Sequence, residues 1–296
     1  MTRPETVDIR EVGPRDGLQV EGPVDPADRV RLVEALVEAG VSHVEACSFV
    51  SPAAVPAMAG AGDVMAKLSR VPGVTYTALV PNRKGAEMAL EAGVDELTVT
   101  VSASPAYSEK NVRMSIDESV AAVEEVCLLA GTVPVDAVIS CAFGSPYEGD
   151  IAPERAAALG DRLVDAGAVS LTYADTTGMA TPRRVAELLD ETGTEVGLHL
   201  HDTRGTALVN AYSALERGVR RFDTSVGGLG GSPFAAGATG NLATEDFVAV
   251  LDDLGVVSGI DLGRLLAAGA LAAELVGHPL ASRVSVAGPR DRLASE

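Results

Sequence analysis

The sequence predicts an α/β fold, a (β/α)8 TIM barrel with a C-terminal helical extension. Strand, short loop and helix alternate eight times along 296 residues, and barrels of this kind typically need about 250 residues. The predicted strands are continuous apolar runs, which is typical of parallel strands covered by helices on both faces. A doubly wound sheet is the alternative, but the GxGxxG turn that usually follows its first strand is absent.

The strands are predicted from apolar, β-branched runs that end at turn-forming residues. The first run stops at Gly13-Pro14, and the last leads into a glycine-rich loop. In chain order, the predicted strands are residues 7–12, 43–47, 74–80, 96–101, 133–142, 169–173, 195–201 and 221–226.

The helices are predicted from apolar residues at helical spacing between start and stop signals. The first begins at Asp25-Pro26 and ends before Gly40. Residues 52–70 read as an irregular helix broken by prolines, and residues 102–114 as a polar, mobile loop. The regular helices are predicted at residues 25–39, 83–92, 116–129, 153–166, 182–191, 206–217, 244–254 and 262–276.

The chain shows no linker or low-complexity tract, so we expect one catalytic domain over residues 1–296. The barrel should occupy about residues 7–255. A closing helix and a ragged, charged tail should follow in about residues 258–296.

The composition excludes several classes of protein. A formal net charge of −19 argues against nucleic acid and anionic membranes as partners, because both select basic patches. The chain has no apolar run of about 18 residues that would span a membrane, and no apolar signal segment at its start. Cys47, Cys127 and Cys141 have unrelated spacings that form no disulfide framework. We therefore expect a reduced, cytoplasmic protein.

Polar side chains gather where the predicted strands end, which is where barrel enzymes place their active sites. His199 and His201 are two apart on one strand, so their side chains point the same way. A hydrogen-bonded pair is the alternative to a metal site. Barrel closure brings Asp16 towards this pair, and Asn241 could add an amide oxygen, so we favour a metal. This donor set suits Mg²⁺ or Mn²⁺ best, although Co²⁺ or Fe²⁺ could enter.

Other charged residues lie close to the predicted strand ends. Arg15 suits a developing enolate or carboxylate oxygen, or it forms a salt bridge to Glu45 or Asp175. Asp175 could be an acid/base group or the partner of a histidine, and Glu45 could orient its neighbours. Asp202 and Arg204 could simply cap the helix that follows them.

Two further features concern loops. Residues 227–240 contain six glycines, which predicts an active-site lid whose backbone takes positive φ or approaches a ligand. Lys110 and Arg113, in the polar loop after the fourth predicted strand, could contact phosphate groups or form an ordinary solvated face.

Five stretches together resemble 3-hydroxy-3-methylglutaryl-CoA lyase. They are EVGPRDGLQ (11–19), SFVSP (48–52), PYEG (146–149), HLHDT (199–203) and the glycine loop through NLATED (227–246). The resemblance runs in order from about residue 7 to 280, and it implies an acyl-CoA substrate and a homodimer. The residues that it implies are the metal ligands Asp16, His199, His201 and Asn241, with Arg15, Gln19, Glu45 and Asp175 around the substrate.

The resemblance also implies a reaction, the cleavage of a 3-hydroxyacyl-CoA to acetyl-CoA and a keto acid. A metal would bind the C3 hydroxyl and the distal carboxylate. His201 or Asp175 would remove the hydroxyl proton, Arg15 would stabilise the enolate, and an acid would then protonate it.

The sequence departs from the family at three positions. The family usually has cysteine where this chain has Ser232 and Ser145, and tyrosine where it has Arg204. Since a thiol has a pKa of about 8.5 and an alkyl hydroxyl is a much weaker acid, Ser232 is a poorer proton donor. The alternatives are a lyase for another acyl-CoA, a condensing synthase, or a protein that binds acyl-CoA with little turnover. Synthases of this superfamily usually carry a further C-terminal region.

Overall fold

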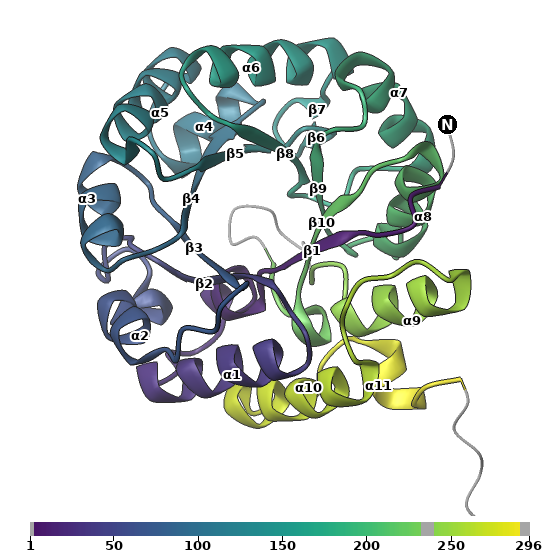
Figure 1. The fold of residues 1–296 in the computed structure, drawn as a ribbon. Coiled ribbons are helices and arrows are strands. Elements are labelled where there is room, and N and C mark those ends of the chain that lie inside the picture. The colour runs from purple at the N-terminus through teal and green to yellow at the C-terminus, as the bar shows by residue number, and fades with distance from the viewer. Residues whose placement is uncertain (1–2, 232–239, 291–296) are drawn as a thin grey trace, which may run out of the picture.

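The computed structural model describes residues 3–231 and 240–290, which form a closed parallel barrel surrounded by helices (Figure 1). The strand order around the barrel is β1-β10-β9-β8-β5-β4-β3-β2, which confirms the predicted (β/α)8 TIM barrel. The barrel strands are β1 (Asp8–Glu11), β2 (His43–Ser48), β3 (Thr75–Leu79), β4 (Glu96–Ser102), β5 (Val135–Ser140), β8 (Ser170–Asp175), β9 (Gly197–Leu200) and β10 (Arg221–Thr224).

The helices lie outside the strands, and the predicted closing helix α10 packs against α1 (Figure 1). Among the described residues, no helix is long and apolar enough to cross a membrane. The α-helices are α1 (Pro26–Glu38), α2 (Ala61–Lys67), α3 (Arg83–Glu91), α4 (Pro105–Asn111), α5 (Ile116–Ala130), α6 (Pro153–Asp165), α7 (Pro182–Thr192), α8 (Ala207–Arg217), α9 (Thr244–Leu254), α10 (Leu262–Val276) and α11 (Arg283–Ala287).

The polar segment at residues 102–114 is not simply a loop, because it contains α4. The Ser104 side chain accepts a hydrogen bond from the Tyr107 amide, and Pro105 occupies the first turn. Both features favour a helix start. Residues 52–70 likewise hold one 3₁₀ turn, η3 (Pro56–Met58), before α2.

Within the predicted tail, residues 283–287 form the short helix α11, which packs against α9. One oxygen of the buried Asp246 carboxylate accepts from the Ser282 hydroxyl at 2.8 Å and the Val284 amide at 2.9 Å. A short hairpin, β6 (Gly144–Ser145) with β7 (Gly149–Asp150), is a further element that the sequence pattern did not predict.

Most of the core lies between the strands and the helices, whereas the barrel interior contains buried charges. Arg10 donates to both carboxylate oxygens of Asp223 at 2.8 Å, and to Asp136 at 2.9 Å. All three residues are at most 6% exposed. Buried charges are costly unless they are paired and hydrogen-bonded. This network is tolerated because each carboxylate is paired with a buried or half-buried arginine.

The start of the glycine loop is packed against the C-terminal segment. Gly227, in the turn η4 (Val226–Gly228), has φ of 65°, and its carbonyl accepts from the amides of Ala281 at 2.9 Å and Ser282 at 3.0 Å. A side chain here would overlap Leu280. Gly227 is therefore required by both its conformation and its close packing.

We expect Gly227→Ala to destabilise the fold more than Gly255→Ala. Gly255 has a similar φ of 68° but open space around it, so its variant should lose about 1 kcal/mol from backbone strain alone. Gly227→Ala should lose about 1–3 kcal/mol more, because of overpacking. Urea unfolding followed by circular dichroism measures both losses. Equal losses would contradict the packing role of Gly227.

Candidate metal centre and active site

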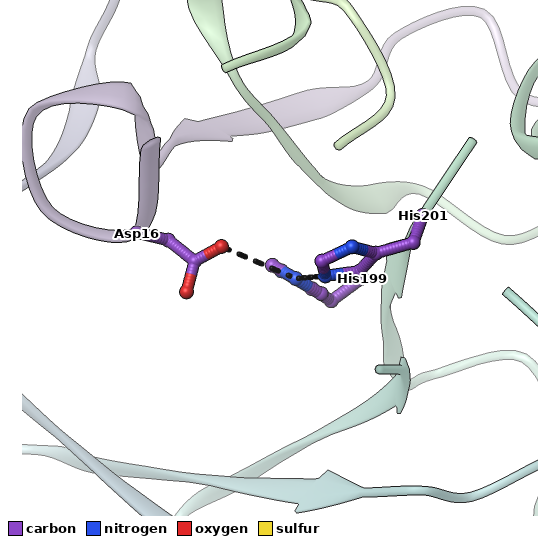
Figure 2. Close-up of side chains that lie close together, drawn as sticks. All are labelled: Asp16, His199 and His201. Carbon is purple, nitrogen blue, oxygen red and sulfur yellow. Dashed lines mark hydrogen bonds and ion pairs between the residues drawn. The ribbon is translucent and has the colours of Figure 1, made fainter. Parts of the chain in front are cut away.

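Three potential metal ligands meet at the carboxyl-terminal end of the barrel. Asp16, His199 and His201 each offer a ligand atom, and these atoms all lie within 4.8 Å of one another. The two histidine Nε2 atoms are 3.1 Å apart, and His199 Nε2 is 3.9 Å from Asp16 Oδ2. Figure 2 shows the Asp16 carboxylate directed towards the two rings. The alternation along β9, continued by one residue to His201, thus brings both histidines to one side, as predicted.

Asp16 reaches the histidines from η1 (Gly13–Gly17), a single π-helical turn directly after β1. The Val12 carbonyl accepts from the amides of Arg15 at 3.1 Å, Asp16 at 2.7 Å and Gly17 at 3.1 Å. Burial alone would raise the pKa of Asp16, but Arg15 and the two histidines outweigh it and hold this pKa below its ordinary value. Asp16 is therefore ionised at neutral pH, as a metal ligand needs.

Asn241 joins this group from the far end of the glycine loop. It forms an isolated antiparallel bridge with His201, and its Nδ2 donates to Asp16 Oδ2 at 2.8 Å and to the Leu229 carbonyl at 2.9 Å. Its Oδ1 is buried and has no hydrogen-bond partner among the described residues. A buried amide oxygen without a partner is costly, and a cation would satisfy it.

The donor set fits a divalent cation. Two imidazole nitrogens, one ionised carboxylate and one unpartnered amide oxygen leave room for water or substrate in an octahedral shell. Asp16, His199, His201 and Asn241 could together hold Mg²⁺ or Mn²⁺, and the same donors also accept Co²⁺ or Fe²⁺.

Arg15 lies between two carboxylates at the edge of this group. Its Nε donates to Glu45 Oε2 at 2.5 Å, and its Nη1 donates to Asp16 Oδ1 at 2.6 Å. The salt bridge that the sequence suggested is thus formed with Glu45. Glu45 is fully buried on β2, and its Oε1 has no hydrogen-bond partner in the described part of the chain. Glu45 therefore holds the Arg15 side chain in a defined orientation at the barrel mouth.

The hydrogen-bond partner of His199 is Asp223 rather than Asp175. Asp223 Oδ2 lies 3.2 Å from His199 Nδ1, because the two residues are paired across β10 and β9. Sequence reasoning missed Asp223, although an acidic residue in the middle of a predicted strand was the available signal. Burial alone would lower the pKa of His199, but Asp223 and Asp16 outweigh it and raise this pKa.

Asp175 instead organises its own loop. Its Oδ1 accepts from the amides of Met179 at 2.6 Å and Ala180 at 3.0 Å. Its Oδ2 is buried and has no partner among residues 3–231 and 240–290. Burial raises the pKa of Asp175 to about 7, so both protonation states are accessible near neutral pH, which suits an acid/base group.

The other predicted substrate-binding residues, Gln19, Lys110 and Arg113, lie in or next to the segments that follow β1 and β4. Gln19 is half-buried in η2 (Leu18–Val20), immediately after the Asp16 turn. Lys110 is exposed on α4, and its Nζ lies 4.7 Å from the Tyr147 ring centroid. Arg113 is exposed just after α4, with φ of 57°. The predicted catalytic residue Ser232 is not one of them, and it lies outside the residues that the structure describes.

The two residues expected to cap a helix differ in their contacts. Asp202 Oδ1 accepts from the Ala207 amide at 3.0 Å in the first turn of α8, which confirms the prediction for Asp202. Arg204 instead donates to the carbonyls of Thr177 at 2.9 Å and Gly178 at 2.7 Å. The capping prediction for Arg204 was wrong, because its long side chain crosses to the loop after β8.

A second buried residue that sequence reasoning missed, Glu11, joins three segments of the site. Its carboxylate accepts from the amides of Gly13 and Val226 at 2.8 Å each and from the Thr244 hydroxyl at 2.5 Å. These partners begin the Asp16 turn, the glycine loop and α9. Burial raises the pKa of Glu11 to about 7, even though these hydrogen bonds favour its ionised form. Glu11 thereby sets the relative positions of segments that carry Asp16 and flank Asn241.

We expect His201→Ala to weaken Mn²⁺ binding by more than about 100-fold, since loss of a ligand should exceed the 10–100-fold cost of losing an outer partner. Electron paramagnetic resonance of free Mn²⁺ measures this affinity. His278→Ala is the matched control, because His278 is exposed and bonded to Glu21 instead. Full retention of Mn²⁺ by His201→Ala would refute the proposed ligand set.

Comparisons with known proteins agree with this geometry. The family model described as HMGL-like matches residues 6–272. The 3-hydroxy-3-isohexenylglutaryl-CoA/hydroxy-methylglutaryl-CoA lyase of Pseudomonas aeruginosa is 42% identical over 295 residues, which cover 97% of this chain and 98% of that protein. The mitochondrial hydroxymethylglutaryl-CoA lyase of Bos taurus is 42% identical over 294 residues, which cover 97% of this chain and 90% of that protein.

A solved structure is similar over nearly its whole length. The HMG-CoA lyase from A. baumannii in complex with coenzyme A and 3-methylmalate is 37% identical, with a TM-score of 0.94, and the match covers 99% of this chain and 98% of that one. Similarity of this extent in both sequence and fold confirms the resemblance found in the sequence motifs. The chain belongs to the HMGL-like family.

Proposed function

We propose that this protein is a divalent-metal-dependent carbon–carbon lyase that cleaves 3-hydroxy-3-methylglutaryl-CoA to acetyl-CoA and acetoacetate. The observation that carries the proposal is the meeting of Asp16, His199, His201 and Asn241 beside Arg15 at the barrel mouth. Full-length similarity to proteins named hydroxymethylglutaryl-CoA lyase supports the same substrate.

The proposed reaction is a retro-Claisen cleavage. A divalent ion held by the four ligands would act as a Lewis acid towards the substrate's hydroxyl and carboxylate oxygens. A protein base takes the proton of the C3 hydroxyl, and the C2–C3 bond breaks as C3 becomes a ketone. The electron pair passes to the thioester as an enolate, which takes a proton at C2 to give acetyl-CoA. Arg15, oriented by Glu45, stabilises the enolate oxygen.

We assign the first proton transfer to Asp175. The two histidines would use their Nε2 lone pairs as metal ligands, which leaves Asp175 as the remaining candidate base of the sequence prediction. Its unpartnered Oδ2 is available to accept a proton, and its raised pKa of about 7 makes the carboxylate a stronger base than an ordinary aspartate. His201 then serves as a ligand alone.

Asp175→Asn should lower kcat by about 10²–10⁴-fold. In the wild type, kcat/KM should rise with pH through about 7, because Asp175 is protonated below its raised pKa and cannot accept a proton there. The variant should lose this rise. Initial rates across the pH range measure both effects, with the exposed Asp165→Asn as control. An unchanged pH profile in Asp175→Asn would assign the base elsewhere.

The substrate's coenzyme A portion needs positive charge on a protein with a net charge of −19. Lys110 and Arg113 lie exposed beyond β4, at the end of the barrel that carries the histidines, and we propose them as phosphate contacts. Gln19 and Glu45, near the Asp16 turn, would contact the acyl group. The coenzyme A complex of the A. baumannii lyase supports an acyl-CoA ligand of this kind.

Ser232 is the proposed proton donor to the enolate, directly or through water. Because a thiol is the stronger acid, we expect Ser232→Cys to raise kcat, by up to about 10²-fold as an improved general acid. The assay measures acetyl-CoA released from 3-hydroxy-3-methylglutaryl-CoA with Mn²⁺, with Ser69→Cys, an exposed serine, as the control thiol.

The same assay tests the substrate. Wild-type turnover at ordinary enzyme rates would support the proposal. If neither the wild type nor Ser232→Cys turned over, the acyl pocket would accept another group. The 3-isohexenyl analogue is the first alternative to assay, because the P. aeruginosa relative's name includes that substrate. A homodimer and a cytoplasmic location are further parts of the proposal, and light scattering and cell fractionation test them.

A further inference from the structure

We propose that Asp223, held by Arg10, is a positioning residue that fixes the tautomer and ring orientation of His199. In this tautomer the proton is on Nδ1, and the lone pair of Nε2 faces Asp16 and His201. The inference rests on the proposed metal-dependent function, but its principal observable belongs to the metal-free protein.

The first step of the argument is the contact itself. Asp223 Oδ2 lies 3.2 Å from His199 Nδ1, and both side chains are buried. Both Asp223 oxygens accept hydrogen bonds from the permanently charged Arg10 guanidinium at 2.8 Å. A carboxylate paired in this way accepts hydrogen bonds and donates none, so the contact with His199 requires the proton on Nδ1.

The second step concerns the other ring nitrogen. His199 Nε2 lies 3.1 Å from His201 Nε2 and 3.9 Å from Asp16 Oδ2. Two lone pairs that face each other at 3.1 Å would repel, so one hydrogen or one cation must lie between them. When His199 is neutral and its single proton is on Nδ1, His201 supplies that hydrogen. A bound cation would take its place.

The third step is the support behind Asp223. Arg10 donates to both Asp223 oxygens at 2.8 Å, through Nε and Nη2, which is a bidentate pairing. Strand register places Arg10 opposite Asp223 and Asp223 opposite His199, across β1, β10 and β9. The three side chains are therefore held at one level by hydrogen-bonded strands rather than by loops. This support limits rotation of the His199 ring, and precise sites depend on such rigid elements.

Asp136 provides a control within the same network. It is also buried, and it accepts from Arg10 Nη1 at 2.9 Å, but its other contacts are with Ser170, Thr172 and Arg221. Removing Asp136 perturbs the same buried ion-pair network without removing the His199 contact. If the network has only a structural role, removing Asp223 and removing Asp136 should affect His199 protonation and Mn²⁺ affinity similarly. If Asp223 positions His199, only the removal of Asp223 should change both.

The test compares Asp223→Ala with Asp136→Ala in the full chain. ¹⁵N–¹H spectra of histidine-labelled, metal-free protein should show an Nδ1-protonated His199 in the wild type and in Asp136→Ala. Asp223→Ala should lose that signature. Mn²⁺ affinity, measured by electron paramagnetic resonance, should fall by about 10–100-fold in Asp223→Ala and by less than about 3-fold in Asp136→Ala.

Two results would overturn the inference. One is an Nδ1-protonated His199 that persists in Asp223→Ala, and the other is an equal loss of Mn²⁺ affinity in both variants. If Asp223→Ala fails to fold, Asp223→Asn keeps the side-chain volume and is compared with Asp136→Asn by the same two readouts. A wild type that binds no Mn²⁺ would refute the proposed function, while the metal-free spectrum would still decide the tautomer.

Discussion

The pairing of β1 with β10 is the constraint on which the candidate site depends. It closes the barrel and sets Arg10 opposite Asp223, while the next pairing sets Asp223 opposite His199. The same closure brings the turn after β1 beside β9, so that Asp16 meets the histidines although about 180 residues separate them in the chain. Without this closure the four candidate ligands would not share a site.

The candidate metal ligands come from both a strand and turns. His199 is on a strand and His201 directly follows it, whereas Asp16 and Asn241 are on turns. Turns hold a side chain less well than strands do, and here a buried carboxylate compensates. Glu11 hydrogen-bonds the start of the Asp16 turn, the start of the glycine loop and the start of α9. The geometry of the four candidate metal ligands therefore depends on Glu11, which need not contact the metal itself.

The structure also explains why some sequence interpretations needed correction. Asp175 and Asp223 both lie on strands beside β9, but the sequence analysis considered only Asp175 as the partner of a histidine. Register decides between them, since Asp223 is paired with His199 and Asp175 is paired with Leu200. Similarly, Arg204 follows the histidine motif like a capping residue, yet its length lets it bind carbonyls of the loop after β8.

The sequence by itself determined the eight barrel strands, the barrel and the family resemblance, and it predicted the candidate metal ligands. These follow from local periodicity, from the alternation of His199 and His201, and from short motifs. Only the tertiary structure decided which buried carboxylates hold the candidate metal ligands in position. Glu11 reaches Val226 and Thr244 across more than 200 residues, and Asp223 is matched by Arg10 across 213. Such contacts depend on barrel closure and strand register, which no local pattern in the chain specifies.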